Sequence, residues 1–530
     1  MKLAISNWTF ENTMDETNLF EAFAKLSSVQ MTSPRSLEII KESIDQRHKP
    51  RYVYTVHVDI NENIACEALN KNNPGLHFRE LSEKDLRGPV EKTRTIRDNP
   101  KKICVVGSGP AGMFAAHSLS MSGFDVTLLE RGNDVPNRHK KVKALFSEGQ
   151  LDSESNICFG EGGAGTFSDG KLTTRKNHPW IRWILSEFVR LGGPKEIIKA
   201  GKPHIGSDRL RALTIQFRKM LIENGVKVHF NQCVDDFKTE KSKIEKLCCG
   251  ESEYNCSDGI VWASGHSARD SYQLLHNKEI PLEAKPFAVG VRIEHQQAWV
   301  NRWKNMAETN DLAADYSVVC NLDKDNSVYS FCMCPGGQIV CSSSHEGYHV
   351  VNGMSNYRRN SEFANAGLVA KVSLDDFGSE SPFDGLNYQA EIEKKAYEAS
   401  GGTYKAPAQR VSDFLIQEKS KTLLPSSYQP GLIPCNFWEI LPEKVCHNLK
   451  KALHQFEEKS PGFAGGGAQL IGTETRTSSP IRIPRNKDGA IDKFENFYPC
   501  GEGAGYAGGI ISAALDGLYI ADCLKKKYYA

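Results

Sequence analysis

The residues best suited to chemistry form a short glycine-rich segment between an apolar run and a helical run. The run ICVV, typical of a buried parallel strand, leads into GSGPAG, whose members are Gly107, Ser108, Gly109, Pro110, Ala111 and Gly112. The first glycine allows a tight turn, the second lets a pyrophosphate approach the backbone, and the third lets helix and strand pack closely. The following helix would direct its positive dipole end at the phosphates. The segment therefore predicts a dinucleotide site.

The next predicted strand supplies an acidic residue where such a site requires one. DVTLLE ends at Glu130, where a carboxylate accepts hydrogen bonds from ribose hydroxyls, and Arg131 follows directly. A second helical run, SDRLRALTIQFRKMLIENG, and the strand-like run VKVHFNQCV come later. Val234 closes that run and is added to the expected cofactor contacts.

Two further segments resemble a known flavoprotein superfamily, the one that includes glutathione reductase and p-hydroxybenzoate hydroxylase. VWASG is similar to its A-T-G-like turn at a strand end, with Ser for Thr, and NFYPCGEGAGYAGGI is similar to the strand, glycine-rich turn and helix that close its FAD site. The resemblance implies FAD as the cofactor. It adds these expected contacts: Ala263, Ser264, Gly265, Gly501, Glu502, Gly508, Gly509 and Ile510.

The glycine-rich turn near the C-terminus departs from the superfamily pattern at one residue. In the superfamily an acidic residue of this turn, usually Asp, holds the ribityl chain, whereas Glu502 is one methylene longer. By the same resemblance, Gly508, Gly509 and Ile510 would bring a helix N-terminus toward the pyrimidine end of the flavin. The helix dipole would favour the negative charge of reduced flavin there.

A closer resemblance covers nearly the whole chain from about residue 40. It is carried by SIDQR and by the blocks CFGEGGAGTFSDGKLTTR, KPFAVGVRIEH, FCMCPGGQIVCSSSHEG with NGMS, and ETRTSSPIRIPR. These look like the family of uncharacterised FAD-dependent dehydrogenases, which implies FAD but no particular substrate. The resemblance places a loop of the first long block along the flavin and pyrophosphate, with contacts expected from Gly162, Gly163, Ala164, Gly165 and Lys171.

Four residues within these blocks are candidates for catalysis. Cys332 and Cys334 form a CxC pair that could exchange electrons with flavin, although strand alternation would point both side chains to one face, as in a buried core. His345 could act as an acid or base near neutral pH. Arg476 could bind a substrate carboxylate or stabilise reduced flavin. A structural role is the alternative for each of them.

Composition and cysteine usage limit the partners and the compartment. The net charge of the 530-residue chain is +1, so no nucleic-acid partner is expected. No run approaches the roughly 20 apolar residues of a membrane span, and the N-terminus has no signal-like segment. The 15 cysteines are scattered, which favours reduced thiols in the cytoplasm, and no two pairs have zinc-finger spacing, so no metal is expected.

The order of elements predicts an α/β fold with four parts. Residues 1–98 are interpreted as a small N-terminal α+β domain with a linker, and residues 281–470 as an inserted mixed-sheet α+β substrate domain. Residues 99–280 and 471–530 are the two parts of a discontinuous, Rossmann-like FAD/NAD(P)-binding domain. No second GxGxxG follows a strand, so no second dinucleotide domain is expected, although NAD(P)H could still bind transiently as an electron donor.

The expected function is that of an FAD-dependent oxidoreductase that passes a hydride through flavin N5 to or from a small-molecule substrate. Three alternatives stay open. They are a monooxygenase or oxidase that uses dioxygen, a flavoprotein that acts on RNA, and a non-catalytic sensor stabilised by FAD. The near-neutral charge disfavours the RNA alternative.

The purified protein is expected to be yellow and to release FAD rather than FMN when denatured, because GSGPAG is suited to a pyrophosphate, which FMN lacks. Chromatography of the released flavin distinguishes the two cofactors. A colourless protein that takes up no FAD from solution would contradict this assignment.

Overall fold

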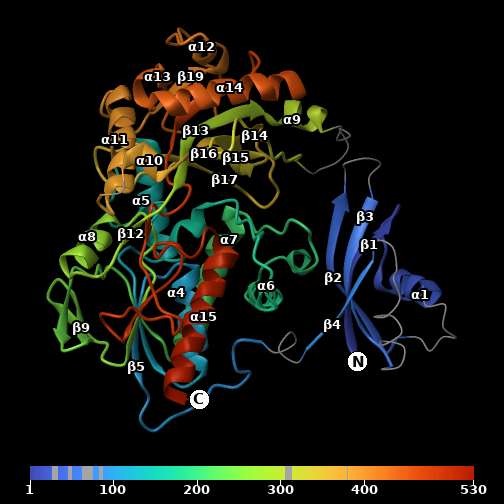
Figure 1. The fold of residues 1–530 in the computed structure, drawn as a ribbon, viewed down its shortest axis with the longest axis vertical. Helices are drawn as coiled ribbons and strands as arrows, with labels where there is room; N and C mark the ends of the chain where they lie inside the picture. The colour runs from blue at the N-terminus through green and yellow to red at the C-terminus, as the bar shows by residue number, and fades with distance from the viewer. Residues whose placement is uncertain are drawn as a thin grey trace. The chain divides into compact units, whose positions relative to one another are not determined.

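The computed structural model describes residues 1–26, 34–45, 51–61, 76–82, 88–304, 313–378 and 380–529. The chain divides into two compact units (Figure 1). Unit 1 contains Met1–Pro89 and Lys171–His204, and unit 2 contains Val90–Gly170 and Ile205–Ala530. Residues 171–204, which the sequence assigned to the FAD-binding domain, therefore belong to the same unit as the N-terminal residues. The division into four parts stays a prediction.

Unit 1 is built on a four-stranded antiparallel sheet with the order β2-β3-β1-β4. The strands are β1 (Lys2–Phe10), β2 (Ser36–Asp45), β3 (Arg51–Asp59) and β4 (His77–Glu80). Alternating apolar residues such as Ile5 and Val56 are buried with Leu19 of helix α1 (Glu16–Leu26). The segment 171–204 adds α6 (Trp180–Arg190) and the 3₁₀ helix η2 (Lys195–Ile198).

Unit 2 contains a five-stranded parallel sheet with the order β23-β11-β5-β6-β7. The strands are β5 (Lys102–Val106), β6 (Asp125–Leu129), β7 (Lys227–His229), β11 (Gly259–Trp262) and β23 (Phe497–Pro499). The central strands β5 and β11 are apolar runs buried along almost their whole length, as parallel strands between helices are. Since β23 returns from the far end of the chain to pair with β11, the Rossmann-like domain is discontinuous, as the sequence predicted.

Helices of this domain pack closely against one another and against the strands. They are α4 (Pro110–Met121), α5 (Val135–Glu148), α7 (Ser207–Glu223), α8 (Arg269–Asn277) and α15 (Ile510–Tyr529). Helices α4 and α15 lie side by side (Figure 1), and a Cβ added at Gly517 would stand 2.1 Å from the carbonyl oxygen of Ala111. Glycine is therefore required at the point where the backbones of the two helices touch.

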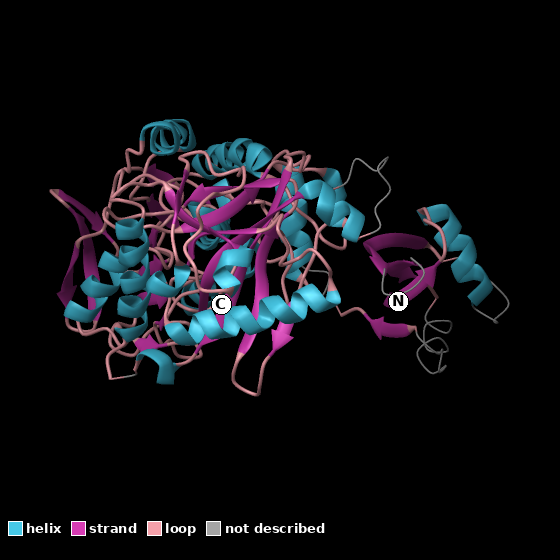
Figure 2. Cartoon of the chain, turned by 90° about the horizontal axis from the view of Figure 1, so that it is seen from above, coloured by secondary structure: helices cyan, strands magenta, loops and turns pink. Residues whose placement is uncertain are grey.

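The residues between β11 and β23 form a seven-stranded mixed sheet with the order β14-β15-β18-β13-β21-β19-β20. Its strands are β13 (Phe287–Gln296), β14 (Val319–Asn321), β15 (Ser327–Cys334), β18 (Phe363–Val372), β19 (Ala406–Arg410), β20 (Leu432–Pro434) and β21 (Gln469–Glu474). The accompanying helices are α9 (Gln297–Trp303), α10 (Leu374–Phe377), α11 (Asp384–Ala399), α12 (Val411–Leu415), α13 (Phe437–Ile440) and α14 (Glu443–Lys459). Figure 2 shows most strands of this unit lying between helices.

Three smaller sheets complete unit 2. They comprise β8 (Asp236–Glu240) with β9 (Lys243–Cys249) and β10 (Ser252–Asn255), β12 (Glu283–Ala284) with β22 (Ile481–Arg482), and β16 (Gly337–Cys341) with β17 (Val351–Ser355). The predicted fold class is confirmed. A parallel Rossmann-like sheet is combined with a mixed sheet, which is inserted between β11 and β23 in the sequence, and with a small N-terminal sheet that carries helix α1. Within the described ranges, no helix combines the length and hydropathy needed to cross a bilayer.

Candidate cofactor and active site

Three segments that are far apart in the sequence meet at the carboxyl ends of the parallel strands. A Cβ at Gly107, whose φ is +97°, would stand 2.3 Å from the carbonyl oxygen of Ala263. A Cβ at Gly503, next to Glu502, would stand 2.6 Å from the carbonyl oxygen of Gly265. The turns of GSGPAG, VWASG and GEGAG are thus in direct backbone contact, which no larger residue would allow.

Other glycines of the same turns face unfilled space. A Cβ built at Gly265, Gly508 or Gly509 would meet no atom within 4 Å, and at Gly109 the nearest atom, Cα of Gly163, is 4.0 Å away. At Gly265 and Gly509 the positive φ angles, +76° and +157°, already favour glycine, whereas Gly109, with a φ of −69°, has no conformational need to lack a side chain. The bare backbone at Gly109 leaves room beside the start of α4. This is the arrangement that a pyrophosphate requires, since its oxygens bind backbone N–H groups at a helix N-terminus. The residues present therefore fit the expected dinucleotide.

The loop predicted to lie along the cofactor does lie along these turns. A Cβ at Gly163 would be 3.0 Å from Cα of Gly109, and one at Gly165 would be 3.3 Å from the Ile510 side chain at the start of α15. Ala164, between the two glycines, is exposed. The loop is thereby in contact with the N-terminal ends of both α4 and α15.

Glu130, expected to bind ribose, is already used by the protein. Its Oε2 accepts hydrogen bonds from the amide and hydroxyl of Ser108 at 2.9 and 2.7 Å, and its Oε1 accepts from the amides of Gly132 and Gly160 at 3.0 and 2.9 Å. A carboxylate has about four acceptor positions. A ribose hydroxyl would have to replace one donor, and the freely rotating Ser108 hydroxyl would cost least to move. The ribose contact stays a prediction.

Arg138 of α5, which the sequence did not single out, shapes the loop ahead of the glycine cluster. Its fully buried guanidinium donates to the carbonyl oxygens of Asn156, Ile157, Gly160 and Glu161 at 2.8, 2.8, 3.1 and 2.6 Å. Burial lowers the pKa of Arg138 to about 10, so the group is still charged at neutral pH. One buried cation therefore binds four carbonyl oxygens of a loop that lies outside the helices and strands.

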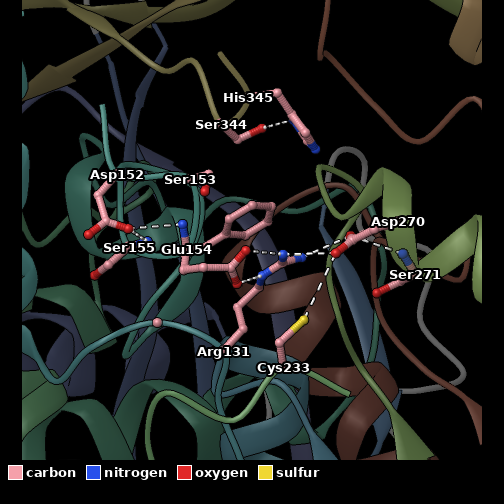
Figure 3. A network of polar contacts seen from close by, with 12 residues as sticks. Arg131, Asp152, Ser153, Glu154, Ser155, Cys233, Asp270, Ser271, Ser344 and His345 are labelled. Atoms are coloured by element: carbon pink, nitrogen blue, oxygen red, sulfur yellow. Dashed lines mark hydrogen bonds and ion pairs between the residues drawn. The ribbon is translucent and has the colours of Figure 1, made fainter. Parts of the chain in front are cut away.

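Arg131 ties the end of β6 to helix α8 instead of projecting freely toward a ligand (Figure 3). One edge of the guanidinium donates twice to Glu154, at 3.0 Å each, and the other donates to Asp270 at 2.9 and 2.8 Å. Burial alone would lower the pKa of Arg131, but the hydrogen bonds to Asp270 and Glu154 outweigh it and raise the pKa. A cofactor contact from Arg131 stays a prediction, and it would compete with two carboxylates.

Arg476 is also committed to protein partners. It donates to both carboxylate oxygens of Glu393 in α11, at 3.1 and 2.9 Å, and to the hydroxyl of Ser344 at 2.6 Å. Arg269 lies 2.9 Å from the same carboxylate. Burial would raise the pKa of Glu393, but Arg269 and Arg476 hold it at about 2. A substrate carboxylate would have to displace Glu393 or Ser344 to reach Arg476.

His345 lies in the same polar network, next to Ser344. Its Nδ1 is 2.9 Å from the Ser344 hydroxyl (Figure 3), and its ring stands edge-on to Phe159, just ahead of the glycine cluster. Burial and the positive charges of Arg476 and Arg269 lower the pKa of His345 to about 4. The imidazole is therefore neutral at neutral pH, which is the form that accepts a proton.

Cys332 and Cys334 occupy an irregular strand end. A bulge between Phe331 and Cys334 interrupts β15, and Cys332 has a φ of +45°. The regular alternation assumed from the sequence is therefore absent, because a bulge inserts an extra residue. The Cys334 thiol donates to the carbonyl oxygen of Cys332 at 3.3 Å, and Arg292 donates to the same oxygen at 2.9 Å. An electron-transfer role for the pair stays a prediction.

Lys171 and Val234, the two other residues expected to contact the cofactor, interact with the protein itself. Lys171 begins the segment that belongs to unit 1, where it pairs with His204 in an isolated antiparallel bridge. Val234 is buried in a core cluster with Cys104 and Leu129, so its side chain is used for packing. Their contacts with a cofactor stay predictions.

Sequence reasoning missed Arg138, Glu393 and Arg269, although they organise the site. Arg138 stands in the charged run PNRHKKVK, which is typical of a solvated helix face, and Glu393 stands in a helix, EIEKK, of the same character. Only Arg269 had a local signal, because it follows the VWASG turn within a few residues. In the described residues, no group of three or more His, Cys, Asp or Glu side chains is arranged to hold a metal ion.

The chain is similar in sequence to known proteins. A family model described as FAD-dependent protein, C-terminal domain-like, matches residues 286–477, and one described as NAD(P)-binding Rossmann-like domain matches residues 105–142. An uncharacterised protein of Clostridium beijerinckii is 38% identical over 536 residues, which cover 100% of this chain and 99% of that protein.

Two further similarities are more distant. One covers 32% of this chain, and the other has 11% sequence identity. The flavin-containing monooxygenase FMO GS-OX-like 9 of Arabidopsis thaliana is 25% identical over 186 residues, which cover 32% of this chain and 38% of that protein. The crystal structure of glycine oxidase from Bacillus cereus is 11% identical and covers 81% of this chain and 95% of its own, with a TM-score of 0.33.

Replacing Gly109 by Ala tests the pyrophosphate position without disturbing the fold. The backbone at Gly109 (φ −69°, ψ 178°) suits alanine, and the new methyl group would meet no protein atom closer than 4.0 Å. We expect FAD affinity to fall at least about tenfold, because the methyl fills the space of a phosphate. Gly467→Ala, on an exposed turn with nothing within 4 Å, is the matched control. Equal FAD affinities for both variants would contradict the assignment of GSGPAG.

Replacing Arg138 by Met tests its role in shaping the loop. Four carbonyl oxygens lose their donor, and each buried group left unpaired costs about 1–3 kcal/mol, partly recovered by relaxation. We expect a thermal unfolding midpoint several degrees lower and weaker FAD uptake. Lys140→Met, an exposed position of the same helix whose ammonium donates to Asn137 one turn away, should change neither. If Arg138→Met leaves melting and FAD uptake unchanged, the loop does not depend on this guanidinium.

Proposed function

Because this chain belongs to the family of FAD-dependent proteins with a Rossmann-like nucleotide-binding domain, we propose that it is an oxidoreductase of the dehydrogenase or reductase type that acts on a small molecule. The observation that carries the proposal is the bare backbone at Gly109, Gly265, Gly508 and Gly509, which faces unfilled space where three turns converge. FAD, when bound, supplies reversible two-electron transfer, and the protein positions it and excludes water.

The proposal assigns separate parts of the cofactor to separate residues. The amides at the start of α4, next to Gly109, would hold the pyrophosphate, since they lie at a helix N-terminus with room beside them. The start of α15 at Ile510, also in contact with the 163–165 loop, would face the flavin ring. Glu502 would hold the ribityl chain.

His345 is the proposed proton acceptor for the substrate. It is neutral at neutral pH and lies beside Phe159, on the segment that leads into the cofactor loop. Arg476 acts in this proposal as a positioning residue, because its bonds to Glu393 and Ser344 fix the hydroxyl beside His345. The proposed reaction assigns no role to the thiols of Cys332 and Cys334.

Anaerobic mixing of the FAD-loaded protein with NADH, NADPH and a panel of small metabolites tests the reaction class. We expect at least one donor to bleach the flavin absorbance within the dead time or over seconds, and reoxidation by air to be slow, without stoichiometric peroxide. His345→Asn should slow reduction by the active metabolite, by about 10²-fold for a lost general base. Cys332→Ser is the control and should leave the rate unchanged.

Rapid reoxidation by air, with stoichiometric peroxide or a hydroxylated product, would contradict the dehydrogenase proposal and favour an oxidase or monooxygenase. A protein that binds FAD but is reduced by no donor would contradict an enzymatic function and favour the sensor alternative. The same mixing experiment identifies NAD(P)H as a transient donor only if it bleaches the flavin.

A further inference from the structure

One guanidinium near His345 lacks the hydrogen-bond partners that its neighbours have. Arg269 begins helix α8, shortly after Gly265 of the VWASG turn. Its side chain is only 17% exposed, and its Nη2 lies 2.9 Å from Oε2 of Glu393 without the alignment of a hydrogen bond. Among the residues that the structure describes, no acceptor other than Glu393 contacts this guanidinium. Arg269 is therefore a largely enclosed cation whose N–H groups are mostly unused.

Two guanidinium groups share a single carboxylate at this place. Glu393 already accepts two hydrogen bonds from Arg476, at 3.1 and 2.9 Å. The carboxylate of Asp270, next to Arg269 in the chain, is bound by Arg131 at 2.9 and 2.8 Å (Figure 3). The group formed by Arg269, Arg476 and Glu393 thus carries one positive charge in excess.

The two guanidinium groups differ in how well this excess is compensated. Burial lowers the pKa of Arg269, and the charge of Arg476 lowers it further, so that together they outweigh Glu393. Burial would lower the pKa of Arg476 as well, but its bonds to Glu393 outweigh burial and raise the pKa. Arg476 therefore has its counter-charge within the protein, whereas Arg269 would be stabilised by a further anion.

The surroundings of Arg269 connect it to the proposed proton acceptor. The Cζ atom of Arg269 lies 5.5 Å from the centroid of the Tyr348 ring, and this ring stands edge-on to His345 with 6.4 Å between the ring centroids. Both aromatic side chains are partly buried. Because the charge of Arg269 contributes to the lowered pKa of His345, the two groups are close enough to interact. An anion bound by Arg269 would lie near the imidazole.

We propose that Arg269 binds the carboxylate of the substrate, and that the substrate of the proposed oxidoreductase is a small monocarboxylate. This inference rests on the proposed function and adds a substrate class to it. A carboxylate fits because its two oxygens match the planar fork of a guanidinium, and its single negative charge matches the single excess positive charge. A phosphate dianion would leave one negative charge without a partner in an enclosed place.

Anaerobic mixing of the FAD-loaded protein with paired probes tests the substrate class. The metabolite that reduces the flavin, or that reoxidises it after reduction by NADH or NADPH, is expected to be a carboxylic acid. Its primary amide has nearly the same size but no charge, and should bind at least about tenfold more weakly. Turnover of a substrate without a carboxylate, or an amide that binds as tightly as the acid, would overturn this inference alone. A protein that takes up no FAD, or whose flavin reacts with no metabolite, would contradict the proposed function and this inference with it.

Substitution of Arg269 separates substrate binding from the chemical step. We expect Arg269→Met to raise the apparent Kd of the active carboxylate at least about tenfold, while the limiting rate of the flavin reaction falls less than about threefold, because the guanidinium binds substrate and transition state alike. His345→Asn should show the opposite division between Kd and rate. Arg269→Lys, which keeps the charge without the planar fork, should give an intermediate Kd. An unchanged Kd for Arg269→Met would overturn the assignment.

Controls distinguish the substrate from the cofactor and from the fold. Arg358→Met, the same substitution at an exposed position, should leave the Kd unchanged. Since Glu393 keeps its hydrogen bonds from Arg476, Arg269→Met is expected to melt and to bind FAD like the natural protein. A loss of FAD affinity equal to the loss of carboxylate affinity would identify the FAD pyrophosphate as the anion at Arg269 and overturn the proposal. If Arg269→Met does not fold, the comparison of acid and amide on the natural protein still decides.

Discussion

The site depends on backbone packed against backbone. At Gly107, Gly503 and Gly517, the carbonyl oxygen of another segment lies 2.1–2.6 Å from the position where a Cβ would be, so each contact exists only because the residue is glycine. These contacts bring the N-terminal ends of α4 and α15 to the same edge of the parallel sheet. Glycine costs stability elsewhere in regular structure, by about 0.5–1 kcal/mol relative to alanine. Here its lack of a side chain creates both the close contacts and the open cradle beside them.

Two groups of three charged side chains organise the region around that cradle. In one a guanidinium lies between two half-exposed carboxylates, and in the other a buried carboxylate lies between two guanidinium groups. Arg131 has Glu154 and Asp270, and Glu393 has Arg269 and Arg476. A buried ion without a partner would be costly, whereas a fully paired set keeps its geometry. The consequence for chemistry is that a ligand could reach Arg131 or Arg476 only by competing with the carboxylates already bound there. Burial and the charges of Arg476 and Arg269 together keep His345 neutral at neutral pH, and its role in proton transfer is part of the proposal.

The local parts of this arrangement were predictable from the sequence. The apolar runs ending in glycine predicted β5 and β11, and GSGPAG and GEGAGYAGGI predicted the starts of α4 and α15. These signals are local because turn geometry and strand burial depend on residues that are neighbours in the chain. That the two glycine-rich turns share one FAD site was implied by the resemblance to the superfamily, and it stays a prediction.

The partners of charged side chains were not predictable in the same way. Arg131 and Arg476 were expected to face a ligand, because nothing in the sequence near them indicates Glu154, Asp270 or Glu393 as partners. Arg138 was missed for the converse reason, since four backbone carbonyls satisfy it and no acidic residue marks it. The bulge at Cys332 likewise comes from strand pairing with β18, which the CxC spacing does not encode.

The central claim is that one FAD molecule occupies the bare backbone where the three glycine-rich turns meet. A crystal structure of the FAD complex measures this directly. The account predicts that the pyrophosphate lies against Gly109 at the start of α4 and that the pyrimidine end of the flavin lies against Gly508, Gly509 and Ile510 at the start of α15. An FAD bound elsewhere, or one whose flavin ring lies far from the start of α15, would contradict it.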